Sequence, residues 1–299
     1  MHIKSAICKP NFTAWFVLQG TIASMHKPGI GTPEDMLSLQ YYLPLAEAAA
    51  ESRLLSSVIY KLPYAAQYAI GEFVTNKGRL LHYYLRKKHI AKWVRDSLST
   101  ADIKQLVILG AGLDVLSMQL ASEFPDVQFI EIDVAESQQF KQAAFKRAGI
   151  PIAHNIEIIA GDLRDPLPSI LKRSAKFSSN QKTLWLAEGL FMFLPESAVV
   201  RLLTEIKKIC ATGSQVVFTS LPVQDLGTRV SKWIQKLYLK REESSILWAL
   251  PQENISTFVD NLGYIHRQSL TYSELHKSHN LQNSNDLKQV GEDMHRIDC

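Results

Sequence analysis

The chain has 299 residues, of which 46% are hydrophobic and 21% are charged. These values are ordinary for a globular protein, and they argue against global disorder, a collagen-like repeat or a disulfide scaffold. The 33 lysines and arginines exceed the 29 aspartates and glutamates by a net charge of +4, which permits an anionic partner without requiring one. The length suits one large α/β domain or two small ones.

The cysteines Cys8, Cys210 and Cys299 are far apart, so their spacing predicts neither a metal site nor a disulfide framework. We therefore expect a reducing compartment, the cytoplasm. No window of about 18 uncharged apolar residues occurs, so no membrane span is expected. Two lysines precede a short apolar patch at residues 12–18, which leaves a signal peptide as a less favoured alternative.

The first hundred residues contain helical patterns at 34–61 and 80–98, and from residue 105 onward apolar runs alternate with helical patterns. The apolar runs predict strands at 105–109, 127–132, 156–160, 183–187, 214–220 and 264–270. The patterns between them predict helices near 114–123, 136–148, 195–211 and 252–262. This alternation is typical of a parallel sheet with crossover helices, an α/β fold.

A glycine turn follows the first predicted strand. The apolar residues 107–109 run into Gly110, Ala111 and Gly112 and then into a helical pattern. Glycines let the backbone turn sharply and let a flat ligand approach closely. A strand-to-helix turn without a ligand remains an alternative at this point.

The next strand adds an acid. Asp133 ends this strand, 23 residues after Gly110, where a ribose diol is usually held. A dinucleotide would place its pyrophosphate at the helix N-terminus, where Asp114 would repel it and Val115 replaces the third glycine. S-adenosylmethionine carries no phosphate, and its ammonium group is attracted by a carboxylate. The charges therefore favour S-adenosylmethionine as the cofactor.

The third and fourth predicted strands also end in polar residues. Asp162 follows the third strand and could accept a hydrogen bond from an adenine amino group, with Leu163 packing on the ring. Glu188 follows the fourth strand. Since ligands of open α/β sheets bind outside the carboxyl ends of the strands, we expect these residues to meet Gly110 and Asp133 at one edge.

These motifs resemble the leucine carboxyl methyltransferase family of S-adenosylmethionine-dependent methyltransferases, and bacterial members most closely. The resemblance extends over about residues 60–270 and is carried by the stretches 109–114, 131–133, 161–165 and 187–196. The last stretch matches the family's "EGLLMYLPE" box with conservative changes. The resemblance implies a Rossmann-like sheet of seven strands, mostly parallel with one antiparallel edge strand, and a helical N-terminal extension. It also implies methyl transfer to an oxygen of a small molecule or a protein carboxylate.

The resemblance further implies an arginine that binds the cofactor's carboxylate, on a helix before the sheet. Arg86 matches best, and Arg79 is the runner-up. A guanidinium suits this task because it grips a carboxylate with two hydrogen bonds. We accordingly divide the chain into a helical lid and substrate region at 1–100, a cofactor-binding domain at 101–275 and a polar tail at 276–299.

Three alternatives remain open from the sequence. A nicotinamide-dependent oxidoreductase would also use the glycine turn. A non-catalytic cofactor-binding homologue is suggested by residues 115–118, which depart from the family pattern and lose its polar side chains. The basic run 79–95 could contact nucleic acid or an anionic membrane, although we expect neither as a partner. No catalytic residue and no metal ligand is assigned.

Overall fold

The computed structural model describes residues 12–52, 54–75, 77–222, 246–278 and 291–299. Seven strands form one sheet in the order β3-β2-β1-β4-β5-β7-β6. The strands are β1 (Gln105–Leu109), β2 (Gln128–Asp133), β3 (Ile156–Ala160), β4 (Thr183–Ala187), β5 (Gln215–Ser220), β6 (Ile265–Leu270) and β7 (Asp293–Asp298). The first five strands pair in parallel, and β7 is antiparallel to both of its neighbours.

The expected fold class, a mostly parallel seven-stranded sheet with N-terminal helices, is confirmed. Two details of the prediction were wrong. The antiparallel strand β7 lies between β5 and β6 and not at the edge, and it falls within the expected polar tail at 276–299. The sequence pattern does not indicate strand β7, because His295 in its middle is polar. In the structure His295 is nevertheless fully buried, and its ring is hydrogen-bonded to Ser220 of β5 and Ser269 of β6, each at 2.8 Å. Within that tail, 279–290 lie outside the described residues.

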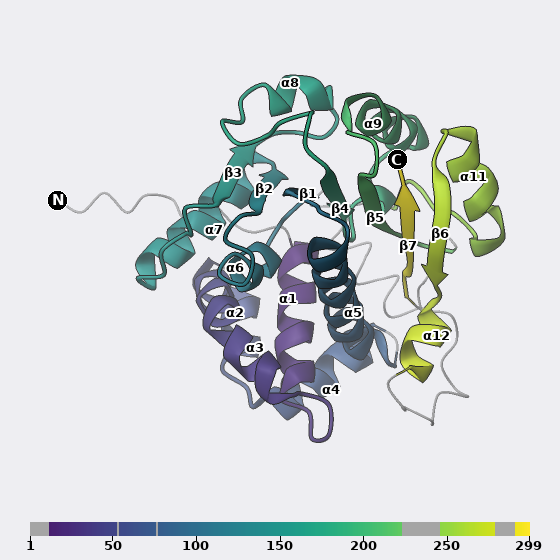
Figure 1. Ribbon diagram of the computed structural model, residues 1–299. Helices are drawn as coiled ribbons and strands as arrows, with labels where there is room; N and C mark the ends of the chain where they lie inside the picture. Colours follow the sequence, from purple (N-terminus) through teal and green to yellow (C-terminus); the bar gives the residue numbers. More distant parts are fainter. Residues whose placement is uncertain (1–11, 53, 76, 223–245, 279–290) are drawn as a thin grey trace.

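The N-terminal region is helical, as predicted, but has more helices than the two expected. They are α1 (Phe12–Met25), α2 (Pro33–Ser52), α3 (Leu54–Tyr60), α4 (Tyr64–Val74) and α5 (Arg79–Thr100). The apolar patch 12–18 belongs to α1, which packs along α5 (Figure 1). One apolar core includes Trp15 of α1, Leu85 of α5 and Ile108 of β1, so these helices are continuous with the sheet. The division near residue 100 stays a prediction.

Helices cover both faces of the sheet (Figure 1). The remaining ones are α6 (Leu116–Leu120), α7 (Ala135–Arg147), α8 (Leu167–Leu171), α9 (Glu196–Ile209), α11 (Ile255–Asn261) and α12 (Tyr272–Lys277), with short 3₁₀ turns at Phe191–Phe193 and Gln252–Asn254. Leu106 and Ile108 of β1 pack in the core with α1 and α5, while Val107 and Leu109 pack in the core with α8 and α9. The strand is apolar throughout because both of its faces are buried. Among the described helices, none is both long and apolar enough to cross a membrane.

Candidate functional site

A cavity of about 800 Å³ opens at the edge of the sheet where the parallel strands end. Its wall includes Gly110 after β1, Asp133 at the end of β2, Gly161 after β3 and Glu188 after β4. Because β7 runs in the opposite direction, its start meets the same edge, and Glu292 lies there. The volume falls within the roughly 300–1,000 Å³ that is typical of small-molecule sites.

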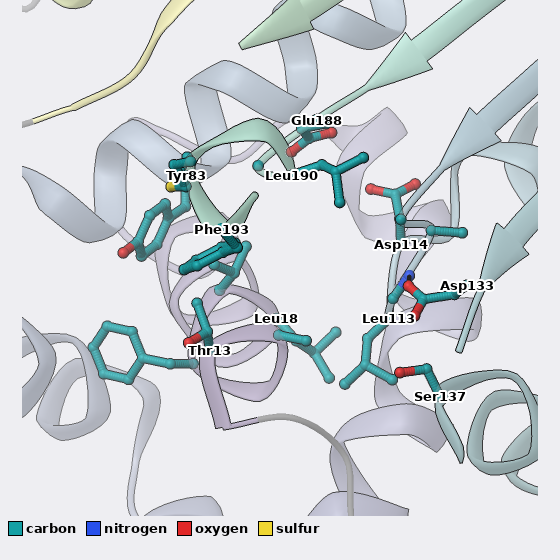
Figure 2. A pocket seen from close by; sticks show the side chains of 18 of the residues that line it. Thr13, Leu18, Tyr83, Leu113, Asp114, Asp133, Ser137, Glu188, Leu190 and Phe193 are labelled. Carbon is teal, nitrogen blue, oxygen red and sulfur yellow. Dashed lines mark hydrogen bonds between the residues drawn. The ribbon is translucent and has the colours of Figure 1, made fainter. Parts of the chain in front are cut away.

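Every site residue named from the sequence lines this cavity: Arg86, Gly110, Gly112, Asp114, Asp133, Asp162, Leu163 and Glu188. The close-up in Figure 2 shows Asp114, Asp133 and Glu188 around it. The expectation that they meet at one edge agrees with their positions, since strand ends in a parallel sheet converge. Arg79, the runner-up arginine, also lines the cavity, two helical turns before Arg86 on α5.

The glycine turn between β1 and α6 is present. Gly110 and Gly112 have φ angles of +68° and +49°, which favour glycine. A Cβ on Gly110 would lie 2.8 Å from Cδ1 of Leu190, whereas a Cβ on Gly112 would meet nothing closer than 3.8 Å. Gly110 is therefore required by close packing, and Gly112 leaves its backbone open to the cavity.

Asp133 is held by the backbone around it. One carboxylate oxygen accepts the N–H of Gly112 at 2.6 Å, and the other accepts the N–H of Val134 at 2.7 Å. Burial raises the pKa of Asp133, and these two hydrogen bonds partly offset that effect. The carboxylate is thereby fixed at the cavity wall, with its position tied to the glycine turn.

Arg86 is 3% exposed and joins α5 to the sheet. Its Nε donates to Oε1 of Glu188 at 3.0 Å, and its Nη1 donates to Glu292. Oε2 of Glu292 accepts the hydroxyl hydrogen of Thr219 at 2.5 Å, and that hydroxyl accepts the N–H of Gly189 at 2.8 Å. Burial alone would lower the pKa of Arg86, but Glu292 and Glu188 more than offset it and hold the pKa above its usual range.

Lys87 completes a buried charge cluster. It pairs with Asp114, and its Nζ lies 3.1 Å from Oε1 of Glu188. Burial alone would lower the pKa of Lys87, but Asp114 and Glu188 outweigh burial and the pKa is raised. Burial likewise opposes the charge of Asp114, and Lys87 outweighs it, so the pKa of Asp114 is lowered. The carboxylates of Asp114, Glu188 and Glu292 thus face the cations of Arg86 and Lys87, which leaves one negative charge in excess.

Asp162 has a local partner. Arg164 from the same loop donates through Nη2 to Oδ2 of Asp162 at 2.6 Å, and the backbone N–H of Arg164 donates to Oδ1 at 2.8 Å. This hydrogen bond from Arg164 lowers the pKa of Asp162. Leu163, 6% exposed, packs between this loop and the core. Asp162 therefore both caps its own turn and borders the cavity.

Sequence reasoning missed several cavity residues. Lys87 lies in the basic run 79–95 and was not assigned to the site, although it stands beside the arginine that was identified. Glu292 was assigned to a polar tail, and only the pairing of β7 with β5 brings it to the site. Helix α1 contributes Thr13, Val17 and neighbouring residues to the wall, which no motif indicated.

The stretch that departs from the family pattern does not face the cavity. Val115, Leu116, Ser117 and Met118 are at most 6% exposed, and the apolar three of them belong to the core. Ser117 donates to Glu131 of β2, below the glycine turn. The departure therefore changes the packing beneath the turn.

The basic run on α5 is largely neutralised by neighbouring carboxylates. Besides Arg86 and Lys87, Lys88 lies 3.2 Å from Asp35. Farther along, Lys92 pairs with Asp96, and Arg95 pairs with Glu34 and Glu123. This compensation disfavours the nucleic-acid and membrane alternatives, which need an unbalanced basic face.

Residues 40–207 match the family described as leucine carboxyl methyltransferase. The match covers more than half of the chain. This protein belongs to the leucine carboxyl methyltransferase family. The EGLLMYLPE-like box identified from the sequence lies inside the matched region and follows β4 at the cavity edge.

Curated relatives of this family member include mycobacterial proteins. A proposed S-adenosyl-L-methionine-dependent methyltransferase of Mycolicibacterium paratuberculosis is 38% identical over 174 residues, 55% of each chain. A protein of the same description from Mycolicibacterium vanbaalenii is 35% identical over 147 residues, 49% of this chain and 45% of its own length. The chain thus matches about half the length of these relatives.

Two solved structures share the fold of this family member over nearly its whole length. A DUF574 family protein from Streptomyces avermitilis has a TM-score of 0.63 and 11% identity, covering 98% of this chain and 99% of its own. A proposed methyltransferase from Thermobifida fusca has a TM-score of 0.58 and 16% identity, covering 98% and 96%. At such low identity the likeness shows the fold alone.

Proposed function

We propose that this protein is an S-adenosylmethionine-dependent O-methyltransferase. The observation that supports it most is the cavity's charge, in which the buried cluster around Arg86 retains one excess carboxylate. S-adenosylmethionine carries a sulfonium, an ammonium and a carboxylate, and so a net charge of +1 that complements this excess. A nicotinamide dinucleotide carries phosphates, which the same cluster would repel.

Each of the eight site residues predicted from the sequence has a role in this proposal. Asp133, fixed by two backbone N–H groups, would accept hydrogen bonds from the ribose hydroxyls. Asp162 and Leu163 would bind the adenine, and Gly110 and Gly112 would let it approach the backbone. Arg86 would hold the cofactor's carboxylate through its remaining N–H groups, while Glu188 and Asp114 attract the ammonium.

When bound, the cofactor would supply an electrophilic methyl group, and the protein would supply position and electrostatic field. A carboxylate acceptor is ionised at neutral pH and would need no general base, whereas a hydroxyl acceptor would need one. The acceptor in this proposal is a small molecule or a protein carboxylate.

Thermal unfolding tests cofactor binding directly. We expect S-adenosylhomocysteine at 100 times its Kd to stabilise the protein by about 2.7 kcal/mol, and Asp133→Ala to abolish most of the rise in Tm. Asp126→Ala, at an exposed acid outside the cavity, is the matched control and should keep the full rise. A rise in Tm with NADH and none with S-adenosylhomocysteine would favour an oxidoreductase.

Charge-conserving variants distinguish the roles of Arg86 and Arg79 in cofactor binding. Arg86→Lys keeps a cation between Glu188 and Glu292 but loses the planar fork, so we expect at least a tenfold weaker Kd for S-adenosylhomocysteine by calorimetry. Arg79→Lys should change the same Kd less than threefold. The reverse pattern would assign the cofactor's carboxylate to Arg79.

A further inference from the structure

His82 lies on α5 where this helix meets α12 and the start of β7. It is fully buried, and it is not among the residues that line the cavity. Its ring packs against the ring of Tyr272 on α12 with centroids 4.8 Å apart, and it stacks on His276 with centroids 6.0 Å apart and planes at 12°. Burying a histidine is unfavourable unless its ring forms a hydrogen bond, so a polar partner is expected here.

The partner of His82 is the backbone just before β7. Nε2 of His82 accepts the N–H of Glu292 at 3.0 Å. Since Nε2 is the acceptor, the proton of the neutral ring is on Nδ1, and a second proton on Nε2 would break this hydrogen bond. Burial, together with the charges of Arg86 and His276, lowers the pKa of His82 well below its usual value. The ring is therefore neutral at neutral pH and remains a hydrogen-bond acceptor.

The chain is also held on both sides of Glu292. A Cβ on Gly291 would lie 2.7 Å from Nε2 of His82 and closer still to Cδ2 of Tyr272, so this position requires glycine. On the other side, Oδ1 of Asp293 accepts the N–H of Tyr272 at 2.9 Å. This short segment is thus fixed against α5 and α12 before the chain enters the sheet as β7.

The side chain of Glu292 links this segment to the proposed cofactor arginine. Its carboxylate accepts hydrogen bonds from Nη1 of Arg86 and from the hydroxyl of Thr219. On its other side, Nε of Arg86 donates to Glu188 at 3.0 Å. A guanidinium held at two nitrogens by two carboxylates has a fixed plane, so its remaining N–H groups point in a fixed direction. His82 does not touch the cavity, but it holds the residue that provides one of these two carboxylates.

We propose that His82 is a positioning residue for cofactor binding. By accepting the backbone N–H of Glu292, its ring holds the Glu292 carboxylate against Arg86 and keeps the guanidinium oriented for the cofactor's carboxylate. The inference rests on the proposed function and adds to it a residue outside the cavity. The role requires a hydrogen-bond acceptor at the place of Nε2, and it does not require an aromatic ring.

Two substitutions of similar size separate the hydrogen bond from the packing. His82→Leu removes the acceptor and leaves the N–H of Glu292 buried without its partner. In His82→Gln, Oε1 is as many bonds from the backbone as Nε2 and can accept in its place. Calorimetry on the full chain should show that His82→Leu binds S-adenosylhomocysteine at least fivefold more weakly. His82→Gln should bind it within twofold of the unaltered protein.

His89→Leu is the matched control, because His89 lies two helical turns farther along α5 and does not line the cavity. It should leave the Kd of S-adenosylhomocysteine within twofold. Circular dichroism at the temperature of the titration establishes that each variant is folded, so that a change in Kd does not reflect a loss of folded protein. His82→Met, whose thioether is only a weak acceptor, replaces His82→Leu if that variant fails to fold.

A double-mutant cycle tests whether His82 acts through Glu292. In the Glu292→Gln background the carboxylate charge that pairs with Arg86 is already lost, so adding His82→Leu should change the Kd less than twofold. In the Asp162→Asn background the arginine and its partners are intact. Adding His82→Leu there should again weaken binding at least fivefold.

The outcomes separate the positioning role from the proposed function. Equal weakening by His82→Gln and His82→Leu would overturn the positioning role, because the ring and not its acceptor would then matter. A less stable His82→Leu with an unchanged Kd would overturn it too, as would equal effects of His82→Leu in the two backgrounds. In each of these results the unaltered protein binds S-adenosylhomocysteine, and the proposed function stands. Failure of the unaltered protein to bind S-adenosylhomocysteine would overturn the proposed function, and His82 would then have no cofactor to position.

Discussion

At the scale of single residues, the charge of the cavity depends on which carboxylates have a cation of their own. Asp114 pairs with Lys87, so its charge is largely balanced. Glu188 and Glu292 share Arg86, and this sharing creates the excess. The acid that the sequence singled out as unfavourable for phosphate is thus paired with a lysine, and the excess negative charge comes from Glu188 after β4 and Glu292 before β7, which share Arg86.

Gly110 offers a residue-scale prediction with a close control. Gly110→Ala would force alanine into a φ of +68° and place its Cβ 2.8 Å from Leu190. Gly149 has a φ of +69° but nothing within 4 Å of the new Cβ. We expect Gly149→Ala to cost about 1 kcal/mol of unfolding free energy from the backbone alone. Gly110→Ala should cost about 2–3 kcal/mol because overpacking adds to this.

Urea denaturation measures both variants. If both variants lose the same unfolding free energy, Leu190 moves away from the new Cβ without cost. Its close approach would then not require glycine at position 110.

At the scale of elements, a buried ion pair supports the turn from below. Lys141 of α7 and Glu131 of β2 are each 1% exposed, with Nζ 2.6 Å from Oε2, and Ser117 of α6 donates to the same carboxylate. The pair therefore connects three elements that meet under the glycine turn. Such a pair is weak evidence for added stability but is costly to break on one side only.

Lys141→Met should destabilise the protein by about 3–5 kcal/mol, because it leaves Glu131 buried and unpaired. The double variant Lys141→Met with Glu131→Gln should recover much of that loss, since glutamine still accepts from Ser117 and carries no charge. Chemical denaturation of the unaltered protein, Lys141→Met and the double variant gives the three unfolding free energies to compare. A double variant no more stable than Lys141→Met would show that packing, and not the unpaired charge, causes the loss.

Strand β7 shows why elements differ in how well sequence predicts them. Strands β1 to β6 lie within one residue of the predicted ranges, because their runs are bounded by turn residues. In β7 only Met294 and Ile297 are apolar residues in the core. His295 can be buried between β5 and β6 only because Ser220 and Ser269 form hydrogen bonds with its two ring nitrogens. Neither serine is near His295 in sequence.

At the scale of the whole molecule, buried neutral histidines should make stability depend on pH. Burial, with a smaller effect of His266, lowers the pKa of His295 to about 3, and burial lowers that of His82 as well. The unfolded chain, with a histidine pKa near 6.5, binds more protons than the folded one below that pH. Stability should therefore fall as the pH drops from about 6.5 toward 3.

For His295 alone the expected loss between pH 7.5 and 5 is about 2 kcal/mol of unfolding free energy. His295→Gln should be less stable at pH 7.5 but should lose about 2 kcal/mol less over this range. Asp293, whose pKa burial raises to about 6, acts in the opposite direction in both proteins and cancels from the difference. Parallel pH profiles for the two proteins would contradict a neutral, buried His295.

The sequence by itself determined the α/β class, six of the strands, the glycine turn and a set of residues that line one cavity. These follow from local patterns, because apolar runs and glycines act on their neighbours along the chain. Only the tertiary structure decided that β7 lies inside the sheet, that Glu292 joins Arg86 and that α1 forms part of the cavity wall. Those features depend on pairings between segments far apart in sequence. Burying the paired groups together stabilises these pairings. The sequence of one segment does not indicate which distant segment it will pair with.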